Sequence, residues 1–441
     1  MKKKIKAFLK IIFPLRVRKL LRRIQTKVRR AVGVMSYIYY TEKMNRNSSK
    51  KSVIEVAVFI MYAEAWNSFE SIYRSIKLRK DMNITVYVFA GNVYMNDGND
   101  KYHLKLKIYD EMINFFRVRG IDIIKAYRPE TDSWISSMDI KADYIFYDRP
   151  YDAVYLEEFS VRQMHKRAKV CYIPYGFMLT KSITMMNVIV PPDFFRYCYL
   201  FFASWNFPAD YVRDNIYNRF ECKFHHIIRE GYPRFDLTAK NNSSDKQFTV
   251  LWNPRFAIRG LSHDDPTSAT SFFDFWQKII PRAYRTKNEY WIIRPHPIAL
   301  SEYVNKKIIT SSELEQYISK LNQNPNTELD RDKDYMKAFA RSSVMLADFS
   351  SIIIEYMASG KPVIYCGNPE AIPIDEMLEC MYHASSWDEA VRCLDDLKNG
   401  HDPLAVKRYK FAEKLSNDGK IGERIVQVLI EDYRKKGQIK Q

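Results

Sequence analysis

The stretch VMLADFSSIIIEYMASGKPVIY at residues 344–365 decides the fold of this chain. Its first four residues predict a strand, and a short turn follows at Asp348. The apolar run up to Gly360 then predicts a helix that opens at Ser350 or Ser351, with the glycine at its C-cap. The last apolar residues predict a second strand. Strand, helix and strand in this order indicate a parallel βαβ unit.

The turn of this unit offers groups that bind an anion. The free N–H groups at a helix start attract a phosphate by about 0.3 to 1 kcal/mol when exposed, and Asp348, Ser350 and Ser351 stand beside them. Simple N-capping by a serine is the structural alternative. Glu355 is the one charged residue of the apolar helix, where a buried carboxylate needs a partner such as a ribose diol or Lys361. We therefore take these three polar residues and Glu355 as candidates for binding a nucleotide.

A second motif, Arg294-Pro-His296-Pro, follows the predicted strand 290–293. The prolines favour an extended backbone, on which residues two apart project to the same side. A guanidinium and an imidazole presented together suit a phosphate group. The alternative is a rigid turn in which His296 bonds only to backbone.

Two more arginines follow strands. Arg234 lies in GYPRFD at residues 231–236, and Arg255 lies in WNPR at residues 252–255. Both positions predict an arginine at the carboxyl end of a strand, where ligands bind in α/β sheets. An ordinary turn is the alternative for the first motif.

Polar residues also end two strands in the first half of the chain. Asp148 and Asp152 follow the predicted strand 143–147, and Tyr175 follows the predicted strand 170–173. These side chains are candidates for binding or deprotonating an acceptor hydroxyl. A turn held by an Asp–Arg pair is the alternative for the first two.

Short β-rich runs alternate with helical patterns on both sides of this region, which predicts two Rossmann-like domains facing across a cleft. The polar stretch AKNNSSDKQ at residues 239–247 marks the boundary between them. The predicted segments are a basic amphipathic segment at 1–40, an acceptor-side domain at 52–240, a nucleotide-side domain at 246–405, and C-terminal helices at 406–441 that pack back across the cleft.

The N-terminal segment carries most of the excess positive charge. The net charge is +18, and residues 1–30 hold 13 lysines and arginines without an acidic residue. Apolar residues recur there at helical spacing, broken at Pro14, so we expect residues 1–34 to lie on an anionic membrane surface. A solvated basic arm, or a helix docked on a protein, is the alternative. Residues 41–52 read as a polar linker.

Several classes of protein are disfavoured. The 441 residues contain no GxGxxG or Walker A motif, and the cysteines and histidines have no metal-ligand spacing. No run is apolar enough to span a membrane, and no secretory signal is recognisable. Scattered cysteines fit a reducing cytoplasm. The body keeps only +5 of the charge, so nucleic-acid binding is disfavoured.

The chain resembles the CDP-glycerol glycerophosphotransferases, which build teichoic acids and capsule polymers. GYPRFD (231–236), RPHP (294–297), ADFSSIIIEYMASGKPVIY (347–365) and DGKIGERI (418–425) carry the resemblance. It implies a GT-B fold, a CDP-linked donor in the second domain and peripheral membrane attachment. It also implies that His296 and Arg294 meet the donor pyrophosphate, that Ser350 and Ser351 hold phosphate, and that Arg234 lines the cleft.

One departure concerns the base. The family carries His-Gly in the first domain, whereas Tyr175-Gly176 stands at the matching position, although Lys181 matches the family. Tyrosine, with an ordinary pKa of about 10, is a poorer base than histidine at neutral pH. Ala257 also stands near the place of an expected arginine.

The expected function is transfer of glycerol phosphate, or a related alditol phosphate, from a CDP-linked donor to a lipid-linked or capsular glycan. His296, Asp148, Asp152 and Tyr175 are the expected catalytic residues, with no metal and no tightly bound cofactor. We expect the protein in the cytoplasm, on the inner face of a bacterial membrane. A nucleotide-sugar glycosyltransferase and a non-catalytic membrane scaffold are the alternatives.

Overall fold

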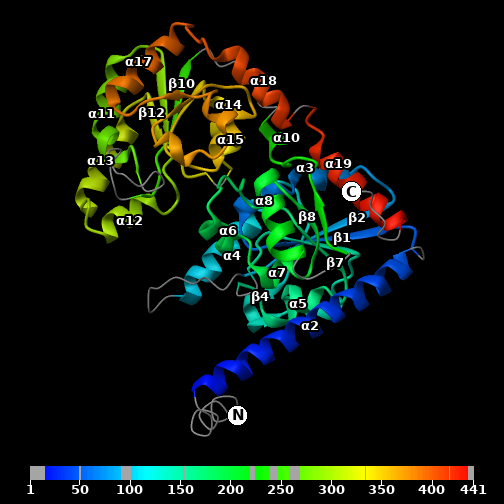
Figure 1. The fold of residues 1–441 in the computed structure, drawn as a ribbon. Helices are drawn as coiled ribbons and strands as arrows, with labels where there is room; N and C mark the ends of the chain where they lie inside the picture. Colours follow the sequence, from blue (N-terminus) through cyan, green and yellow to red (C-terminus); the bar gives the residue numbers. More distant parts are fainter. Residues whose placement is uncertain are drawn as a thin grey trace.

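The structure is a computed structural model, and it describes residues 15–48, 51–90, 101–151, 154–218, 224–238, 247–257, 269–332, 334–416 and 418–435. Two parallel sheets dominate it (Figure 1). Residues 54–238, called here the first unit, carry a seven-stranded sheet. Residues 247–398, called the second unit, carry a six-stranded sheet.

The sheet of the first unit has the strand order β3-β2-β1-β6-β7-β8-β9, and all of its strand pairs are parallel. Its central strands are buried along their length, because helices cover both faces. The strands are β1 (Ile54–Ile60), β2 (Met82–Val88), β3 (Ile123–Lys125), β6 (Tyr144–Tyr147), β7 (Lys169–Tyr172), β8 (Cys198–Phe202) and β9 (His226–Ile228).

The helices of the first unit are mostly short. Among the described residues they include η2 (Ala63–Ser68), α3 (Glu70–Lys77), α4 (Lys101–Val118), α5 (Val161–Met164), α6 (Ile183–Ile189), α7 (Pro192–Phe195), α8 (Asn206–Val212), the π-helical η7 (Arg213–Tyr217) and α10 (Phe235–Thr238). A two-stranded antiparallel ribbon joins β4 (Tyr127–Arg128) to β5 (Ser133–Trp134).

The sheet of the second unit repeats the same winding. Its order is β12-β11-β10-β13-β14-β15, again all parallel, with chain order reversing beside β10. In such a sheet, ligands bind outside the carboxyl ends of the strands at the reversal. The strands are β10 (Phe248–Asn253), β11 (Glu289–Ile293), β12 (Thr327–Leu329), β13 (Val344–Ala347), β14 (Val363–Tyr365) and β15 (Tyr382–His383).

Helices also cover the sheet of the second unit (Figure 1). They are α11 (Phe272–Arg285), α12 (Ala299–Asn305), α13 (Ser311–Gln323), α14 (Met336–Arg341), α15 (Ile352–Met357), α16 (Asp375–Leu378) and α17 (Trp387–Lys398). Buried apolar residues of both units form one continuous cluster, which joins Tyr232 and Phe235 of the first unit to Tyr335 and Ile353 of the second. The contact between the units is therefore packed.

The predicted α/β class with two parallel sheets is confirmed, and the strands expected at residues 143–147, 170–173, 290–293 and 344–347 occur within about one residue of those bounds. Two strands, β12 and β15, were not predicted, because three and two residues are too short to show a periodicity. The helical residues after β1 are divided between η2, which ends at Ser68, and α3, which begins at Glu70.

The N-terminal helix differs from its prediction. Helix α2 runs from Leu15 to Asn47, so the expected polar linker is helical over residues 41–47. Thr41 and Asn45 lie on the buried side of this helix. Pro14 lies outside the described residues.

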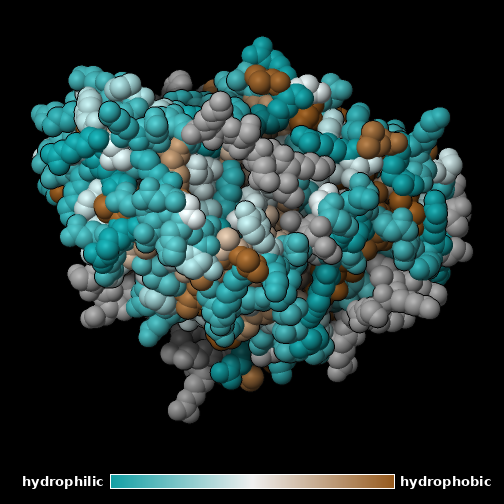
Figure 2. Space-filling model, turned by 90° about the horizontal axis from the view of Figure 1, so that it is seen from above, coloured by the Kyte–Doolittle hydropathy of each residue, from teal (hydrophilic) through white to brown (hydrophobic). Residues whose placement is uncertain are grey.

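Two C-terminal helices return the chain to the first unit. Helix α18 (Ala405–Ser416) contacts α15 and α10, and α19 (Ile421–Arg434) packs along α3 (Figure 1). The approach to α3 is close, because a Cβ atom on Gly422 would lie 2.6 Å from the Oγ of Ser71. Among the described helices, none is both long and apolar enough to cross a membrane. Seen from above, the surface is mostly hydrophilic with scattered apolar side chains (Figure 2).

Candidate functional site

Three neighbouring strands of the second unit end at one edge, and each is followed by a predicted site motif. The strands are β11, β10 and β13, and their motifs hold His296, Arg255 and the Ser350–Ser351 pair. A hydrogen bond joins two of these loops, since the Asn253 side-chain amide donates to the Arg294 carbonyl at 2.7 Å. The three motifs therefore lie at the same edge of the sheet, as predicted from the sequence. Arg255, His296, Ser350 and Ser351 are called the His296 site below.

His296 is exposed at this edge. Its ring packs against Phe256 with centroids 4.7 Å apart. The backbone N–H of Ile298 donates to Nδ1 at 3.4 Å, so the neutral imidazole carries its proton on Nε2. Desolvation, and then the charge of Arg255, lower the pKa of His296. The ring therefore offers an Nε2–H donor to a ligand at neutral pH.

Arg255 lies near this ring, since its charge acts on the pKa of His296 and its guanidinium lies 5.3 Å from the ring centroid of Phe256. The guanidinium of Arg255 donates to the Phe349 carbonyl at 2.8 Å, which holds it beside Ser350. Ser350 and Ser351 are half-buried and precede α15. The loops at this edge thus carry a guanidinium, an imidazole and two serine hydroxyls, all of which are groups that can donate to a phosphate.

Asp348 does not belong to that face, although the sequence analysis placed it among the nucleotide-binding residues. It is buried, and its carboxylate accepts from the Arg255 N–H at 2.8 Å, the Thr270 hydroxyl at 2.8 Å and the Ser271 N–H at 2.9 Å. Burial raises the pKa of Asp348. This residue braces the loops that carry the site and has no direction open to a ligand.

Arg294 is also directed elsewhere. It forms an ion pair with Asp330 at 2.5 Å and donates to the Asp332 carbonyl at 2.7 Å, and its guanidinium lies 5.6 Å from the Tyr335 ring centroid. The expectation that Arg294 and His296 project together is wrong. Asp330 follows β12, the strand that was not predicted, and its charge draws the guanidinium away.

Arg234 occupies the junction of the two units. Within the first unit it donates to the Ser68 hydroxyl and the Glu64 carbonyl, both at 2.9 Å, and to the Tyr175 carbonyl. Toward the second unit it donates to the Tyr335 hydroxyl and lies 3.5 Å from Glu355. Arg234 therefore joins the units, and its donors are used within the protein instead of lining an open cleft.

Glu355 is buried in the same place, and burial raises its pKa. One carboxylate oxygen, Oε2, accepts from the Tyr335 hydroxyl, whereas Oε1 has no hydrogen-bond partner among the described residues. Lys361, one of its two expected partners, donates to the carbonyls of Phe339 and Ala340. Arg234, Tyr335 and Glu355 form what we call the interunit cluster. No sequence motif pointed to Tyr335, which directly precedes α14.

The first unit brings the Tyr175–Gly176 loop to the His296 site. Tyr175 is half-buried, with the guanidinium of Arg149 lying 4.9 Å from its ring centroid. A Cβ atom on Gly176 would lie 3.6 Å from the Ser351 Oγ, so this loop meets the serines of the second unit. The predicted acceptor side and the predicted donor side are in contact at this point.

The two predicted aspartates of the first unit have different outcomes. Asp148 is buried and accepts from the Met61 N–H and the Tyr155 hydroxyl, both at 2.8 Å. Burial raises its pKa, yet its partners enclose it, so it braces a loop and does not face an acceptor. Asp152 lies outside the described residues.

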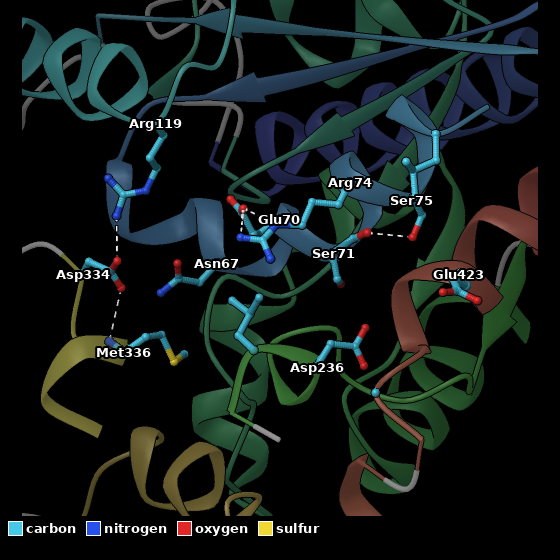
Figure 3. Close-up of a pocket in the computed structure, with 13 residues that line it drawn as sticks. Asn67, Glu70, Ser71, Arg74, Ser75, Arg119, Asp236, Asp334, Met336 and Glu423 are labelled. Carbon is cyan, nitrogen blue, oxygen red and sulfur yellow. Dashed lines mark hydrogen bonds and ion pairs between the residues drawn. The ribbon is translucent and has the colours of Figure 1, made fainter. Parts of the chain in front are cut away.

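A pocket of about 400 Å³ lies elsewhere, along α3 at the junction of the units (Figure 3). Its charged groups are largely paired with one another, as in Arg119 with Asp334 at 2.7 Å and Arg74 with Glu70 at 2.7 Å. Four acidic and two basic side chains line it, which disfavours a pyrophosphate ligand there. Within the described part of the chain, no cluster of His, Cys, Asp or Glu could hold a metal ion.

Comparisons with known proteins show which proteins this chain resembles. Residues 205–368 match the family model described as CDP-Glycerol:Poly(glycerophosphate) glycerophosphotransferase, a range that includes Arg234 and the whole His296 site. The chain is 25% identical over 307 residues to the minor teichoic acid biosynthesis protein GgaB of Bacillus subtilis (strain 168). The match covers 63% of this chain and 30% of GgaB, so the chain spans about a third of that relative. The predicted resemblance is confirmed.

Solved structures share the fold at low identity. The wall teichoic acid polymerase TagF superposes with a TM-score of 0.51 at 11% identity, over 95% of this chain and 99% of that one. The UDP-GlcNAc 2-epimerase from Neisseria meningitidis bound to UDP-GlcNAc superposes with a TM-score of 0.52 at 12% identity, over 86% and 100%. These likenesses establish the two-domain GT-B type of fold.

Proposed function

Because the chain resembles the CDP-glycerol glycerophosphotransferases over the residues that form the His296 site, we propose that it transfers glycerol phosphate, or a related alditol phosphate. The donor is CDP-linked, and the acceptor is a hydroxyl of a lipid-linked or capsular, teichoic-acid-like glycan. TagF has also been solved with CDPG, in a variant that superposes with a TM-score of 0.51 at 14% identity, over 96% of this chain and 99% of that one.

One observation carries this proposal. Arg255, His296 and the Ser350–Ser351 pair present phosphate-binding groups at one edge of the second sheet, and the Tyr175–Gly176 loop of the first unit meets them there. A donor phosphate on the second unit and an acceptor hydroxyl on the first would therefore be brought together.

The chemistry follows from these positions. The acceptor oxygen attacks the β-phosphorus of the donor, a new P–O bond forms, and the P–O bond to CMP breaks. Nε2–H of His296 and the guanidinium of Arg255 donate to the phosphate oxygens, where negative charge develops. Arg294 acts indirectly, since it contacts the ring of Tyr335 in the interunit cluster.

The acceptor must also lose a proton. Asp148 is enclosed by its partners, so we assign it a structural role. We propose that Tyr175 orients the acceptor hydroxyl at the contact with Ser351, and that Asp152, which lies outside the described residues, is the remaining candidate base. We propose no metal and no tightly bound cofactor for this reaction.

The test is the release of CMP from CDP-glycerol in the presence of an acceptor glycan. The variant His296→Ala should lose activity by at least about a hundredfold, because a charge-stabilising donor is removed from the transition state. His401→Ala is the matched control. His401 is exposed and lies shortly after α17, so this variant should keep full activity. Full activity in His296→Ala would refute the assignment.

A non-catalytic scaffold is the second candidate, favoured by Tyr175 at the position of the family histidine. It predicts that the protein binds no nucleotide donor. A nucleotide-sugar glycosyltransferase would bind UDP- or GDP-sugars in place of cytidine nucleotides, so a donor panel separates all three.

We also propose that the protein acts at the inner face of a bacterial membrane. Residues 1–34 hold 13 basic residues and no acidic one, and their apolar residues recur at helical spacing. A lipid-linked acceptor would be presented at that surface.

A further inference from the structure

Helix α2 has two halves with different surroundings. Residues 17–32, where described, are exposed, whereas several residues from Gly33 to Ser48 are buried against the first unit. We infer that α2 is a rigid mount: its second half is fixed to the first unit, and an apolar stripe along the opposite face, from Val17 to Tyr39, lies in the interface of an anionic bilayer. This inference rests on the proposed membrane attachment and extends it beyond residue 34.

The second half of α2 is held by specific contacts. Tyr37 is buried, its hydroxyl donates to the Phe224 carbonyl at 3.0 Å, and its ring stacks on His225 at 4.7 Å. The Ser36 hydroxyl lies 3.1 Å from Nε2 of His165. A Cβ atom on Gly33 would lie 2.6 Å from the Tyr197 hydroxyl, so the helix approaches the first unit as closely as a glycine allows.

The opposite face of the helix is apolar and exposed. Met35 and Tyr39 each stand two residues from Tyr37, which turns them roughly 200° away from the docked face. Spacings of three and four residues continue the same stripe toward the N-terminus. Its members are Val17, Leu20, Leu21, Ile24, Val28, Val32, Met35 and Tyr39, and all are exposed. The stripe is about 33 Å long at 1.5 Å per residue.

The positive charge of α2 indicates what covers this stripe. Between Leu15 and Arg30 the sequence holds eight lysines and arginines, and the first acidic residue of the chain is Glu42. A second copy of α2 laid along the stripe would bring two wholly cationic segments together, which is unfavourable. Anionic headgroups neutralise the basic residues while the apolar stripe enters the acyl boundary.

This mount fixes the orientation of the protein. In Figure 1, α2 passes beneath the first unit, on the side away from the second unit. The first unit, which carries the Tyr175–Gly176 loop, is then held at the bilayer, and the second unit stands farther from it.

The experiment measures flotation of the full-length protein with phosphatidylcholine vesicles, with and without phosphatidylglycerol. Ile24→Glu changes the projecting half of the stripe, and Met35→Glu changes the docked half, where the side chain is 70% exposed. Val406→Glu is the matched control, because Val406 is 69% exposed in α18. Thermal unfolding checks that each variant is folded.

The wild type and Val406→Glu should bind the anionic vesicles, and both stripe variants should bind about tenfold more weakly. If Ile24→Glu weakens binding and Met35→Glu does not, the rigid mount is wrong while membrane attachment stands. If the wild type does not bind anionic vesicles, both proposals fail. A wild-type dimer in sedimentation that Met35→Glu dissociates would also overturn the bilayer assignment.

Discussion

Buried carboxylates stand at two places in this molecule, and they differ in how completely they are paired. At the amino ends of β6 and β7, Asp432 of α19 accepts from Lys169 and Tyr199, both at 2.6 Å, and from Tyr144. We call these four residues the amino-edge cluster. At the opposite edge, Glu355 accepts through one oxygen, while its other oxygen has no partner among the described residues.

This difference in pairing indicates that the amino-edge cluster has a structural role and that the interunit cluster has a functional one. Asp432 has both oxygens occupied, and Lys169 beside it is buried, so this cluster fixes the C-terminal helix to the first unit. The interunit cluster instead joins two bodies and contacts both the Tyr175 loop, through Arg234, and Arg294, through Tyr335. Changes in the first cluster should cost stability, and changes in the second should cost activity.

The largest expected effect is on stability, at Asp432. Asp432→Ala leaves Lys169 buried without its counter-ion, so the free energy of unfolding should fall by about 3 to 5 kcal/mol. Urea denaturation measures it. The double variant Lys169→Met with Asp432→Leu should recover most of the loss, because both charges are removed together. If Asp432→Ala lowered the free energy of unfolding by less than about 1 kcal/mol, the amino-edge cluster would not be a major source of stability.

The pH dependence should have opposite signs at two buried histidines of the first unit and at Glu355. Burial lowers the pKa of His165 to about 4 and lowers that of His226, which lies beside the amino-edge cluster. Below pH 6.5 the unfolded chain binds these protons first, so stability falls as pH drops from about 6.5 to 4. The pKa of Glu355 is raised, so the folded state binds that proton first and the contribution of Glu355 to stability grows as pH falls.

The His165 contribution should reach about 3 kcal/mol, at 1.36 kcal/mol per pH unit. Urea denaturation between pH 7.5 and 4.5 tests it. His165→Gln should flatten the acid limb, while the exposed His401→Gln should not. An acid limb of unchanged depth in His165→Gln would contradict this reading.

Two matched tyrosines separate the clusters by their effect on rate. Tyr335→Phe and Tyr199→Phe each remove one hydroxyl donor from a buried carboxylate, and each should cost about 1 to 3 kcal/mol of stability. Tyr335→Phe should also lower the transfer rate about tenfold while donor affinity is kept, since its ring still lies against Arg294. Equal rates in the two variants would remove the functional distinction.

A smaller effect is expected at Glu355 itself. Glu355→Gln keeps an oxygen that can accept from Tyr335, but it removes the charge 3.5 Å from the buried Arg234, so the free energy of unfolding should fall by about 1 to 2 kcal/mol while Arg234 keeps its other acceptors. Asp432→Asn should cost more, because an amide cannot accept on both sides as Asp432 does. Equal losses in the two variants, measured by urea denaturation, would contradict the contrast in pairing.

An exposed ion pair sets the baseline. Lys407 and Glu379 lie 2.5 Å apart with side chains that are 48% and 58% exposed. Lys407→Ala should change stability by only about 0 to 0.5 kcal/mol, since solvent screens the pair. A loss as large as that of Asp432→Ala would mean that burial does not distinguish the two pairs.

Local pattern predicted most of the fold. Residues 344–365 alone indicated the βαβ unit, and the polar residues after β10, β11 and β13 indicated the edge at which His296 lies. The short strand β12 was missed, and with it Asp330, the partner of Arg294.

The position of a residue after a strand did not predict whether its side chain faces a ligand or holds a loop. Asp348 and Ser350 both follow β13, yet Asp348 is enclosed by loop donors and Ser350 is half-exposed. The two clusters could not be predicted from the sequence either, because their members are distant along the chain. Arg234 and Tyr335 are 101 residues apart, and Lys169 and Asp432 are 263 residues apart. Only tertiary packing brings such residues together.

The most direct measurement is calorimetric titration of the protein and of His296→Ala with CDP-glycerol, CDP-ribitol, CMP and a panel of UDP- and GDP-sugars. The proposed function predicts binding confined to the cytidine nucleotides and weakened in His296→Ala, with Tyr335→Phe unchanged. Preference for a nucleotide sugar, or cytidine binding that does not depend on His296, would contradict it.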